Sequence, residues 1–318
     1  MSISVTRGRK TILQKNSIPQ HAPGQRSCPV CLSEGTKAGH QTQSMALRIC
    51  CDCSFCWDEG APLNPTALYQ ASYFNNDGAH HGYANYFESM QFHARTFRHR
   101  LLRARHFAPT ANSLLDVGCA LGECLSVAKQ LGWERVHGLD VSDYAVQFAE
   151  KRDLSVEKGT LLTTRLARAT FDVVLLQDMI EHVHSPVDYL RSANELLKPN
   201  GILLIVTPDI GGFWHRLLGA KWYHFKPGEH LCFFSRRSLT LALKQSGFEV
   251  LQASTSLHYL GIGYILSRLK GYSPRFFSIL IRLATRLHLD QFGLWIPIDE
   301  LEVWARKNDE SPALAKSM

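Results

Sequence analysis

Apolar segments alternate with amphipathic segments through the middle of the chain. Predicted strands, most of them rich in Leu, Ile and Val, lie at residues 114–117, 136–141, 156–158, 171–177, 202–207 and 248–254. Predicted helices lie between them, including those at 144–151, 186–197 and 235–246. The segment at 171–177 is almost wholly apolar, as expected of a strand buried on both faces of a parallel sheet. This alternation predicts an α/β fold with a doubly wound sheet.

The segment at 114–123 has the pattern of a strand, a glycine-containing turn and the start of a helix. Gly118 and Gly122 lack a Cβ and therefore allow the backbone to approach a ligand. Asp116 lies near the carboxyl end of the strand, where open α/β sheets bind ligands. The next strand ends in Asp140, about twenty residues beyond the turn, at the spacing of a carboxylate that binds a ribose diol. An ordinary βαβ unit with a tight turn and no ligand is the alternative.

Residues 114–142 resemble motif I and its acidic partner in class I S-adenosylmethionine-dependent methyltransferases. The nicotinamide fingerprint G-x-G-x-x-G does not fit, because position 120 is alanine and the third glycine is missing. Residues 177–183 resemble the E-H-V signature of these methyltransferases, and residues 198–201 resemble their K-P-x-G turn. The resemblance covers roughly residues 110–257. It implies a Rossmann-like sheet of seven strands, in which residues 301–307 form a last, antiparallel strand.

The same resemblance implies S-adenosylmethionine as the cofactor and indicates which residues contact it. The expected cofactor-binding residues are Asp116, Gly118, Ala120, Gly122, Asp140, Val141, Thr160 and Gln177. Ala120 departs mildly from the pattern, which often has a glycine there. Thr160 stands where these methyltransferases usually have an acid or amide that contacts adenine. We therefore expect backbone groups to contribute to adenine recognition.

Methyl transfer from a sulfonium is an in-line displacement, so the protein mainly aligns the reactants and excludes water. A base is needed only where the acceptor is a weakly acidic hydroxyl. His230 and His182 are the candidate catalytic residues, and a structural role for His182 in orienting Glu181 is an alternative. The resemblance to quinone O-methyltransferases implies another alternative, a divalent ion near Glu181 and His182. The aromatic segment at 213–225 is predicted to form a lid over the acceptor.

Six of the nine cysteines lie between positions 28 and 56. Cys28 and Cys31 form one C-x-x-C pair, and Cys50 and Cys53 form a second pair about twenty residues later, which is typical of a tetrahedral Zn²⁺ site. Cys53 and Cys56 are the alternative second pair. Free cysteines without a metal are the alternative to the whole site. We predict a small N-terminal zinc ribbon at residues 27–60.

The chain has 318 residues and a formal charge of +7, which permits contact with nucleic acid or an anionic membrane but requires neither. No run of about eighteen apolar residues and no apolar signal-peptide core are present, so we expect a cytoplasmic protein. The basic stretch at 92–107, which includes Arg100, is predicted to be a solvated helix face, with a nucleic-acid patch as the alternative. The predicted domains are a disordered tail at 1–26, the ribbon at 27–60, a helical linker and cofactor lid at 61–108, the methyltransferase core at 109–257 and 299–308, and an insertion at 258–298.

The insertion is predicted to contain amphipathic helices, of which the clearest lies at 275–289. A helical wheel gathers the polar side chains on a narrow stripe and leaves apolar side chains over the rest; the stripe consists of Arg275, Ser278, Arg282 and Arg286. Such a helix suits a membrane interface, which would place the protein peripherally at the inner membrane and favour a lipid-linked acceptor. The alternative is a helix packed against the lid or against a dimer partner, and the oligomeric state stays open.

The first functional hypothesis is O-methylation of a small-molecule, lipid-linked or glycan acceptor. The alternative is a zinc-finger rRNA methyltransferase. Against it, residues 177–180 read Q-D-M-I where a base-gripping N-P-P-[FY] motif would be expected. An inactive binding module is a third class, and the intact set of Asp116, Gly118, Gly122 and Asp140 argues against it.

Overall fold

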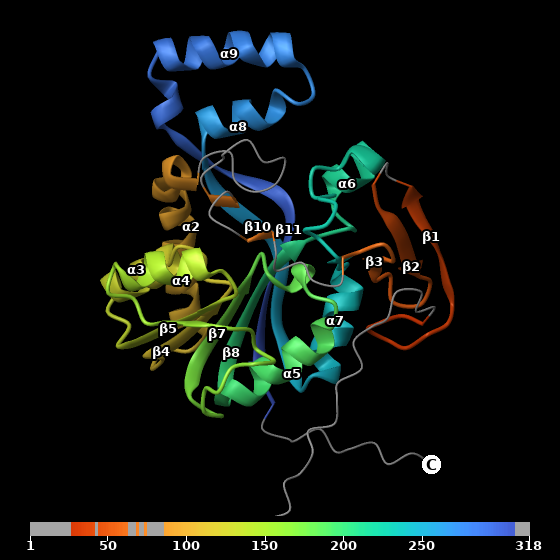
Figure 1. Ribbon diagram of the computed structural model, residues 1–318, viewed down its shortest axis with the longest axis vertical. Coiled ribbons are helices and arrows are strands. Elements are labelled where there is room, and N and C mark those ends of the chain that lie inside the picture. The colour runs from red at the N-terminus through yellow and green to blue at the C-terminus, as the bar shows by residue number, and fades with distance from the viewer. Residues whose placement is uncertain (1–26, 42–43, 63–67, 70–72, 75–85, 309–318) are drawn as a thin grey trace, which may run out of the picture.

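The computed structural model describes residues 27–41, 44–62, 68–69, 73–74 and 86–308 (Figure 1). The predicted tail at residues 1–26 lies outside these ranges, as does most of the segment 63–85 within the predicted linker and lid. In the described part of the chain, no helix has the length and apolar character that a membrane span needs.

A seven-stranded mixed sheet forms the centre of the molecule, with the strand order β10-β11-β8-β7-β4-β5-β6 (Figure 1). The strands are β4 (Ser113–Val117), β5 (Arg135–Asp140), β6 (Val156–Lys158), β7 (Phe171–Gln177), β8 (Leu197–Pro208), β10 (Phe248–Gly261) and β11 (Gly293–Lys307). Strands β4 to β8 pair in parallel, and β11 pairs antiparallel with both β8 and β10. The predicted Rossmann-like doubly wound sheet with an antiparallel last strand is confirmed.

Helices cover both faces of this sheet (Figure 1); they are α2 (Tyr86–Phe107), α3 (Glu123–Gln130), α4 (Asp143–Glu150), α5 (Pro186–Leu196) and α7 (Arg236–Gln245). Successive residues of a strand point to opposite faces. On β8, Leu203 and Ile205 pack in the cluster that contains α5 and α7. Leu204 and Val206 pack in the other cluster, with α2 and α3. The sheet is therefore buried on both faces, which accounts for the nearly continuous apolar strands of the sequence.

The N-terminal cysteine-rich segment forms a second sheet of four strands, in the order β1-β2-β3-β9. The strands are β1 (Thr36–Gln41), β2 (Ala46–Cys50), β3 (Cys56–Asp58) and β9 (Cys232–Phe233). Strand β9 comes from the methyltransferase core and pairs antiparallel with β3. Phe55 and Trp57 pack in the same apolar cluster as Phe234 of the core. The segment predicted to be a zinc ribbon thus joins the core through a shared sheet and a shared apolar cluster.

The insertion differs from its predicted bounds because the flanking strands are longer than expected. Strands β10 and β11 stay paired from Phe248 and Lys307 out to Gly261 and Gly293. The helices α8 (Ile262–Leu269) and α9 (Pro274–Arg286) and the short turn η4 (Leu289–Gln291) occupy the tip of this hairpin (Figure 1). The hairpin was missed because its strands mix polar and apolar residues without a clean alternation, so that only their pairing identifies them.

Gly122 is required at the first turn of the core for steric reasons. Its φ is 80°, and a Cβ built there would lie 2.4 Å from Cδ1 of Leu154. We expect Gly122→Ala to lower the free energy of unfolding by about 3 kcal/mol, the sum of a left-handed backbone and an overpacked core. Chemical denaturation measures this loss.

Gly228 provides the matched control for this substitution. Its φ is 78°, but a Cβ there would have nothing within 4 Å. Gly228→Ala should therefore show only the backbone cost of about 1 kcal/mol. Equal losses for the two variants would contradict the steric account.

Candidate active site

One cavity of about 1080 Å³ lies at the carboxyl ends of β4, β5 and β7. It brings together seven of the residues that the sequence singled out: Gly118, Ala120, Asp140, Val141, Thr160, His182 and His230. Tyr69, Tyr73 and Phe74, from the described part of the predicted lid, also line it. The cavity therefore joins the predicted cofactor contacts to the predicted catalytic histidines.

The turn after β4 holds Asp140 in place. The backbone N–H of Ala120 donates to Oδ2 of Asp140 at 2.9 Å, and the N–H of Ser142 donates to Oδ1 at 2.9 Å. Burial raises the pKa of Asp140, and these amides oppose the rise. Ala120 has a φ of 47°, in the left-handed region that glycine tolerates best. The carboxylate is thus fixed at the cavity wall, where it can accept hydrogen bonds from a diol.

Three of the predicted cofactor contacts do not line the cavity: Asp116, Gly122 and Gln177. Gln177 is buried, and its side chain accepts a hydrogen bond from Nη1 of Arg100 at 3.0 Å. Asp116 is buried, and burial raises its pKa to about 7 while a hydrogen bond with Gln177 opposes the rise. Gly122 packs against Leu154. These three residues are buried outside the cavity lining, and their contact with the cofactor stays a prediction.

His182 and His230 lie close together in the cavity, with ring centroids 4.8 Å apart. His182 lies in the turn η2 (Ile180–His182), and its Nδ1 donates to the carbonyl of Glu229 at 2.7 Å. Burial lowers the pKa of His182 to about 4 and that of His230 well below its usual value. Both rings are therefore neutral near pH 7 and are weak proton acceptors.

Glu181, His182 and His230 also have the arrangement of a metal-binding group. Their ligand atoms lie within 4.8 Å of one another. Glu181 is buried, and its Oε2 accepts from Thr207 at 3.0 Å. Its Oε1 has no hydrogen-bond partner among the described residues. Neutral imidazoles and a buried carboxylate oxygen suit a divalent ion, so this alternative for the site stays open.

Cys28, Cys31, Cys50 and Cys53 converge at the base of the N-terminal sheet. The Sγ atoms of Cys28 and Cys53 are 3.5 Å apart, and those of Cys31 and Cys50 are 3.4 Å apart. Four thiolates around Zn²⁺ at about 2.3 Å have sulfur atoms separated by about 3.8 Å, so the four side chains fit a zinc ion. Cys56 packs in a different cluster with Trp222 and Phe233. The geometry therefore groups Cys50 and Cys53, rather than Cys53 and Cys56, with the first pair.

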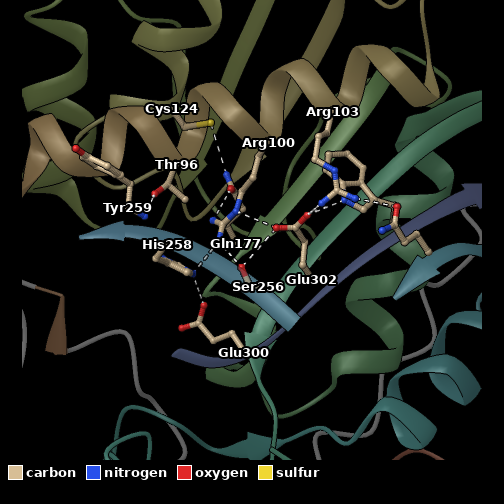
Figure 2. A network of polar contacts seen from close by, with 12 residues as sticks. Thr96, Arg100, Arg103, Cys124, Gln177, Ser256, His258, Tyr259, Glu300 and Glu302 are labelled. Atoms are coloured by element: carbon tan, nitrogen blue, oxygen red, sulfur yellow. Dashed lines mark hydrogen bonds and ion pairs between the residues drawn. The ribbon is translucent and has the colours of Figure 1, made fainter. Parts of the chain in front are cut away.

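Four further cavity residues were not among the predicted site residues: Arg100, Asp178, His258 and Glu300. Figure 2 shows Arg100 between the end of β7 and the strands β10 and β11, where it contacts Gln177, Ser256 and His258. Arg100 is buried and ion-paired with Glu302, so its predicted place on a solvated helix face is wrong. Asp178 has a φ of 51°, a backbone conformation that often marks functional positions.

Fold and site together define the class of protein. The seven-stranded sheet with its antiparallel last strand, the glycine turn after β4 and the acid at the end of β5 are the features that the sequence resemblance implied. The chain belongs to the methyltransferase domain family, whose model matches residues 86–253. It is a methyltransferase that depends on S-adenosylmethionine.

Several curated proteins are similar to this chain over part of its length. A ubiquinone biosynthesis O-methyltransferase from Ruegeria pomeroyi is 37% identical over 148 residues, which are 43% of this chain and 59% of that protein. Its counterpart from Cereibacter sphaeroides is 35% identical over 117 residues, covering 34% and 47%. The chain thus spans about half the length of the curated relatives it matches.

Solved structures of methyltransferases are also similar to this chain. One, from Archaeoglobus fulgidus, has a TM-score of 0.46 and 20% identity and covers 70% of this chain and 98% of that one. Another, from Mesorhizobium loti, has a TM-score of 0.44 and 20% identity, with coverage of 65% and 96%.

Proposed function

We propose that this methyltransferase transfers its methyl group to a hydroxyl oxygen of a small-molecule, lipid-linked or glycan acceptor. One observation carries the proposal: a single cavity contains both the Asp140 carboxylate, which suits a ribose, and a cluster of buried histidines and acids. Carboxyl groups in the same cavity as the predicted cofactor contacts suit a hydroxyl, which must lose a proton when its oxygen is methylated. The similarity to ubiquinone biosynthesis O-methyltransferases supports the same chemistry.

The part of the cavity away from Asp140 suits an acceptor with apolar surface. Helix α8, the turn that follows it and strand β11 contribute its wall, with Tyr264, Ile265, Leu269, Tyr272 and Ile296. Trp214 and Leu218, from helix α6 (Phe213–Leu218) in the predicted lid segment, also face the cavity. Apolar and aromatic walls with a few polar groups are typical of small-molecule sites.

Helix α9 supports a lipid-linked acceptor through a contact with the membrane surface. Phe276, Ile279, Leu283 and Leu287 form an exposed apolar stripe on it, although Ala284 is buried. Arg275, Arg282 and Arg286 are also exposed on this helix. A helix that shows both apolar and basic side chains binds an anionic bilayer surface in parallel orientation. We propose that residues 275–289 bring the protein to the cytoplasmic face of the inner membrane.

Flotation with lipid vesicles tests the membrane contact. We expect the protein to float with vesicles that contain phosphatidylglycerol and to float less with pure phosphatidylcholine. Replacing Ile279 and Leu283 together by Asp should weaken binding about 100-fold, because two apolar anchors are lost. Leu102→Asp is the control, since Leu102 on α2 is 48% exposed and Leu283 is 50% exposed. Absence of flotation by the native chain, or an equal loss of vesicle binding in Leu102→Asp, would contradict the proposed membrane contact.

We further propose that Cys28, Cys31, Cys50 and Cys53 bind one structural zinc ion. The separations of their Sγ atoms and the burial of Cys28, Cys50 and Cys53 support this role. The ion would tie the two C-x-x-C turns together beneath the shared sheet.

A labelled-methyl assay tests the acceptor class. The purified chain is incubated with S-adenosylmethionine labelled in its methyl group and with separate pools of lipid extract, soluble sugar nucleotides and total RNA. Label in the lipid or sugar pool is the expected result. Label in RNA alone would contradict the proposal and support the zinc-finger rRNA methyltransferase instead.

A further inference from the structure

A histidine and a glutamate from neighbouring strands meet inside the cavity. Nε2 of His258 on β10 lies 2.6 Å from Oε2 of Glu300 on β11. Both side chains line the cavity, and both residues are less than 10% exposed. They share this cavity with Gly118, Ala120 and Asp140, so the pair faces the same space as the predicted cofactor contacts.

Arg100 determines which nitrogen of His258 carries the proton. Its Nη2 lies 2.8 Å from the same Nε2 of His258 (Figure 2). An arginine nitrogen can only donate, so Nε2 accepts and carries no proton. His258 is then the neutral tautomer protonated at Nδ1. Oε2 of Glu300 has no hydrogen-bond partner among the described residues, so the carboxylate form of Glu300 can accept a proton there.

The surroundings of Glu300 make it the member of the pair that titrates near neutral pH. Burial raises the pKa of Glu300 to about 7, and Arg100 opposes the rise. Burial and then Arg100 lower the pKa of His258 to about 3. The other ionisable groups that act on Glu300 are Asp178 at the end of β7, Lys226 after η3 (Gly219–Lys221), and Glu302 on β11. His224, whose Nε2 lies 3.9 Å from Oε1 of Glu300, has a pKa lowered to about 3 by burial.

We infer that Glu300, oriented by His258 and Arg100, is the catalytic residue that takes the proton of the acceptor hydroxyl. This inference rests on the proposed O-methylation. The hydroxyl oxygen attacks the methyl carbon of S-adenosylmethionine, and the new C–O bond forms as the C–S bond breaks. The electron pair of the C–S bond returns to sulfur, which leaves a neutral thioether. The hydroxyl proton goes to the Glu300 carboxylate, so charge and atoms balance.

Glu300 suits this role better than the two histidines that the sequence indicated. A general base is most effective when its pKa lies near the working pH. Burial lowers the pKa of His182 to about 4 and that of His230 well below its usual value. The low dielectric of the cavity thus weakens the imidazoles as bases and strengthens the carboxylates. His258 and Arg100 are positioning residues, because they act on the substrate through Glu300.

The decisive measurement is infrared difference spectroscopy of the full chain with S-adenosylhomocysteine bound. Spectra taken between about pH 5 and about pH 9 report each carboxyl group that gains or loses a proton. We expect a carboxylic-acid band that decreases as the pH rises through about 7 and that decreases by less in Glu300→Gln, since burial raises the pKa of Asp116 and of Asp178 to about 7 as well. An equal decrease of the band in the native chain and in Glu300→Gln, or the absence of any such band from the native chain, would overturn the inference.

Methyl transfer to catechol, used as a probe hydroxyl acceptor, gives a second test. Glu300→Gln should bind S-adenosylhomocysteine as the native chain does but transfer methyl at least about 100-fold more slowly. The native rate should rise as the pH increases through about 7, because Glu300 loses its proton there. Glu300→Gln should lack this rise, and Glu300→Asp should keep it. A native rate in Glu300→Gln would overturn the inference. Loss of S-adenosylhomocysteine binding by the native chain would instead overturn the proposed function.

Glu302→Gln is the matched control for folding. Glu302 lies two residues further along the same strand and is buried, but it pairs with Arg100 and Arg103 and does not line the cavity. This variant should unfold at a lower temperature and still show the titrating band. Glu300→Gln should keep its unfolding temperature at about pH 8, because it removes a buried charge. Loss of the band in Glu302→Gln would show that Glu300 is not its source.

Discussion

Asp140→Ala should lose at least about 100-fold in affinity for S-adenosylhomocysteine and keep its fold. The carboxylate accepts one hydrogen bond from the N–H of Ala120 and one from that of Ser142, which fix its orientation at the cavity wall. A charged acceptor that binds two ribose hydroxyls contributes about 3 kcal/mol, because hydrogen bonds to charged groups are stronger than neutral ones. Calorimetric titration measures the loss.

The controls separate binding from folding. Asp143→Ala makes the same change three residues further along the chain, at an exposed side chain that pairs with Lys158 outside the cavity. It should bind S-adenosylhomocysteine normally. Asp140→Asn keeps one oxygen acceptor for the turn and should unfold close to the native temperature. Native affinity in Asp140→Ala would remove this carboxylate from the cofactor site.

Removing zinc should destabilise the N-terminal sheet and the part of the core that it shares. We expect about one zinc ion per chain, with a binding free energy of about 10 kcal/mol, as in other four-thiolate structural sites. Cys50→Ser should lose the ion and lower the unfolding temperature. Because β9 pairs with β3, hydrogen exchange should also increase at Cys232 and Phe233 of the core. Metal analysis and exchange measurements report the two effects.

Cys51→Ser is the control for this prediction, since Cys51 is exposed beside the ligand cysteines and lies outside their cluster. It should keep the ion and the native unfolding temperature. A chain that contains no zinc as purified, or equal effects of the two variants, would contradict the zinc ribbon.

The sequence located those features whose signal is local. The glycine turn and Asp140 lie in adjacent strands separated by one helix, so their spacing alone places both at one edge of the sheet. The apolar strands likewise predicted the sheet and the order of its elements, because their apolar pattern is also a local signal. The grouping of the cysteine pairs needed the structure to separate Cys50 from Cys56, because both spacings are C-x-x-C.

The features that were missed depend on contacts between distant segments. The position of Gln177 at the end of β7 does not fix where its side chain points, and only the structure shows its hydrogen bond with Arg100. Arg100 itself looked solvated, because nothing local shows that β10 and β11 cover that face of α2. His258 and Glu300 are 42 positions apart in the printed sequence and meet only where the extended hairpin pairs.

Calorimetric titration of the native chain with S-adenosylhomocysteine tests the central claim most directly. We predict one site per chain with a micromolar dissociation constant, since the cavity, the glycine turn and Asp140 are all in place. A heat of binding that the native chain shows and Asp140→Ala lacks would agree with a methyltransferase whose cofactor lies in this cavity. Absence of binding by the native, folded chain would contradict the account of the site.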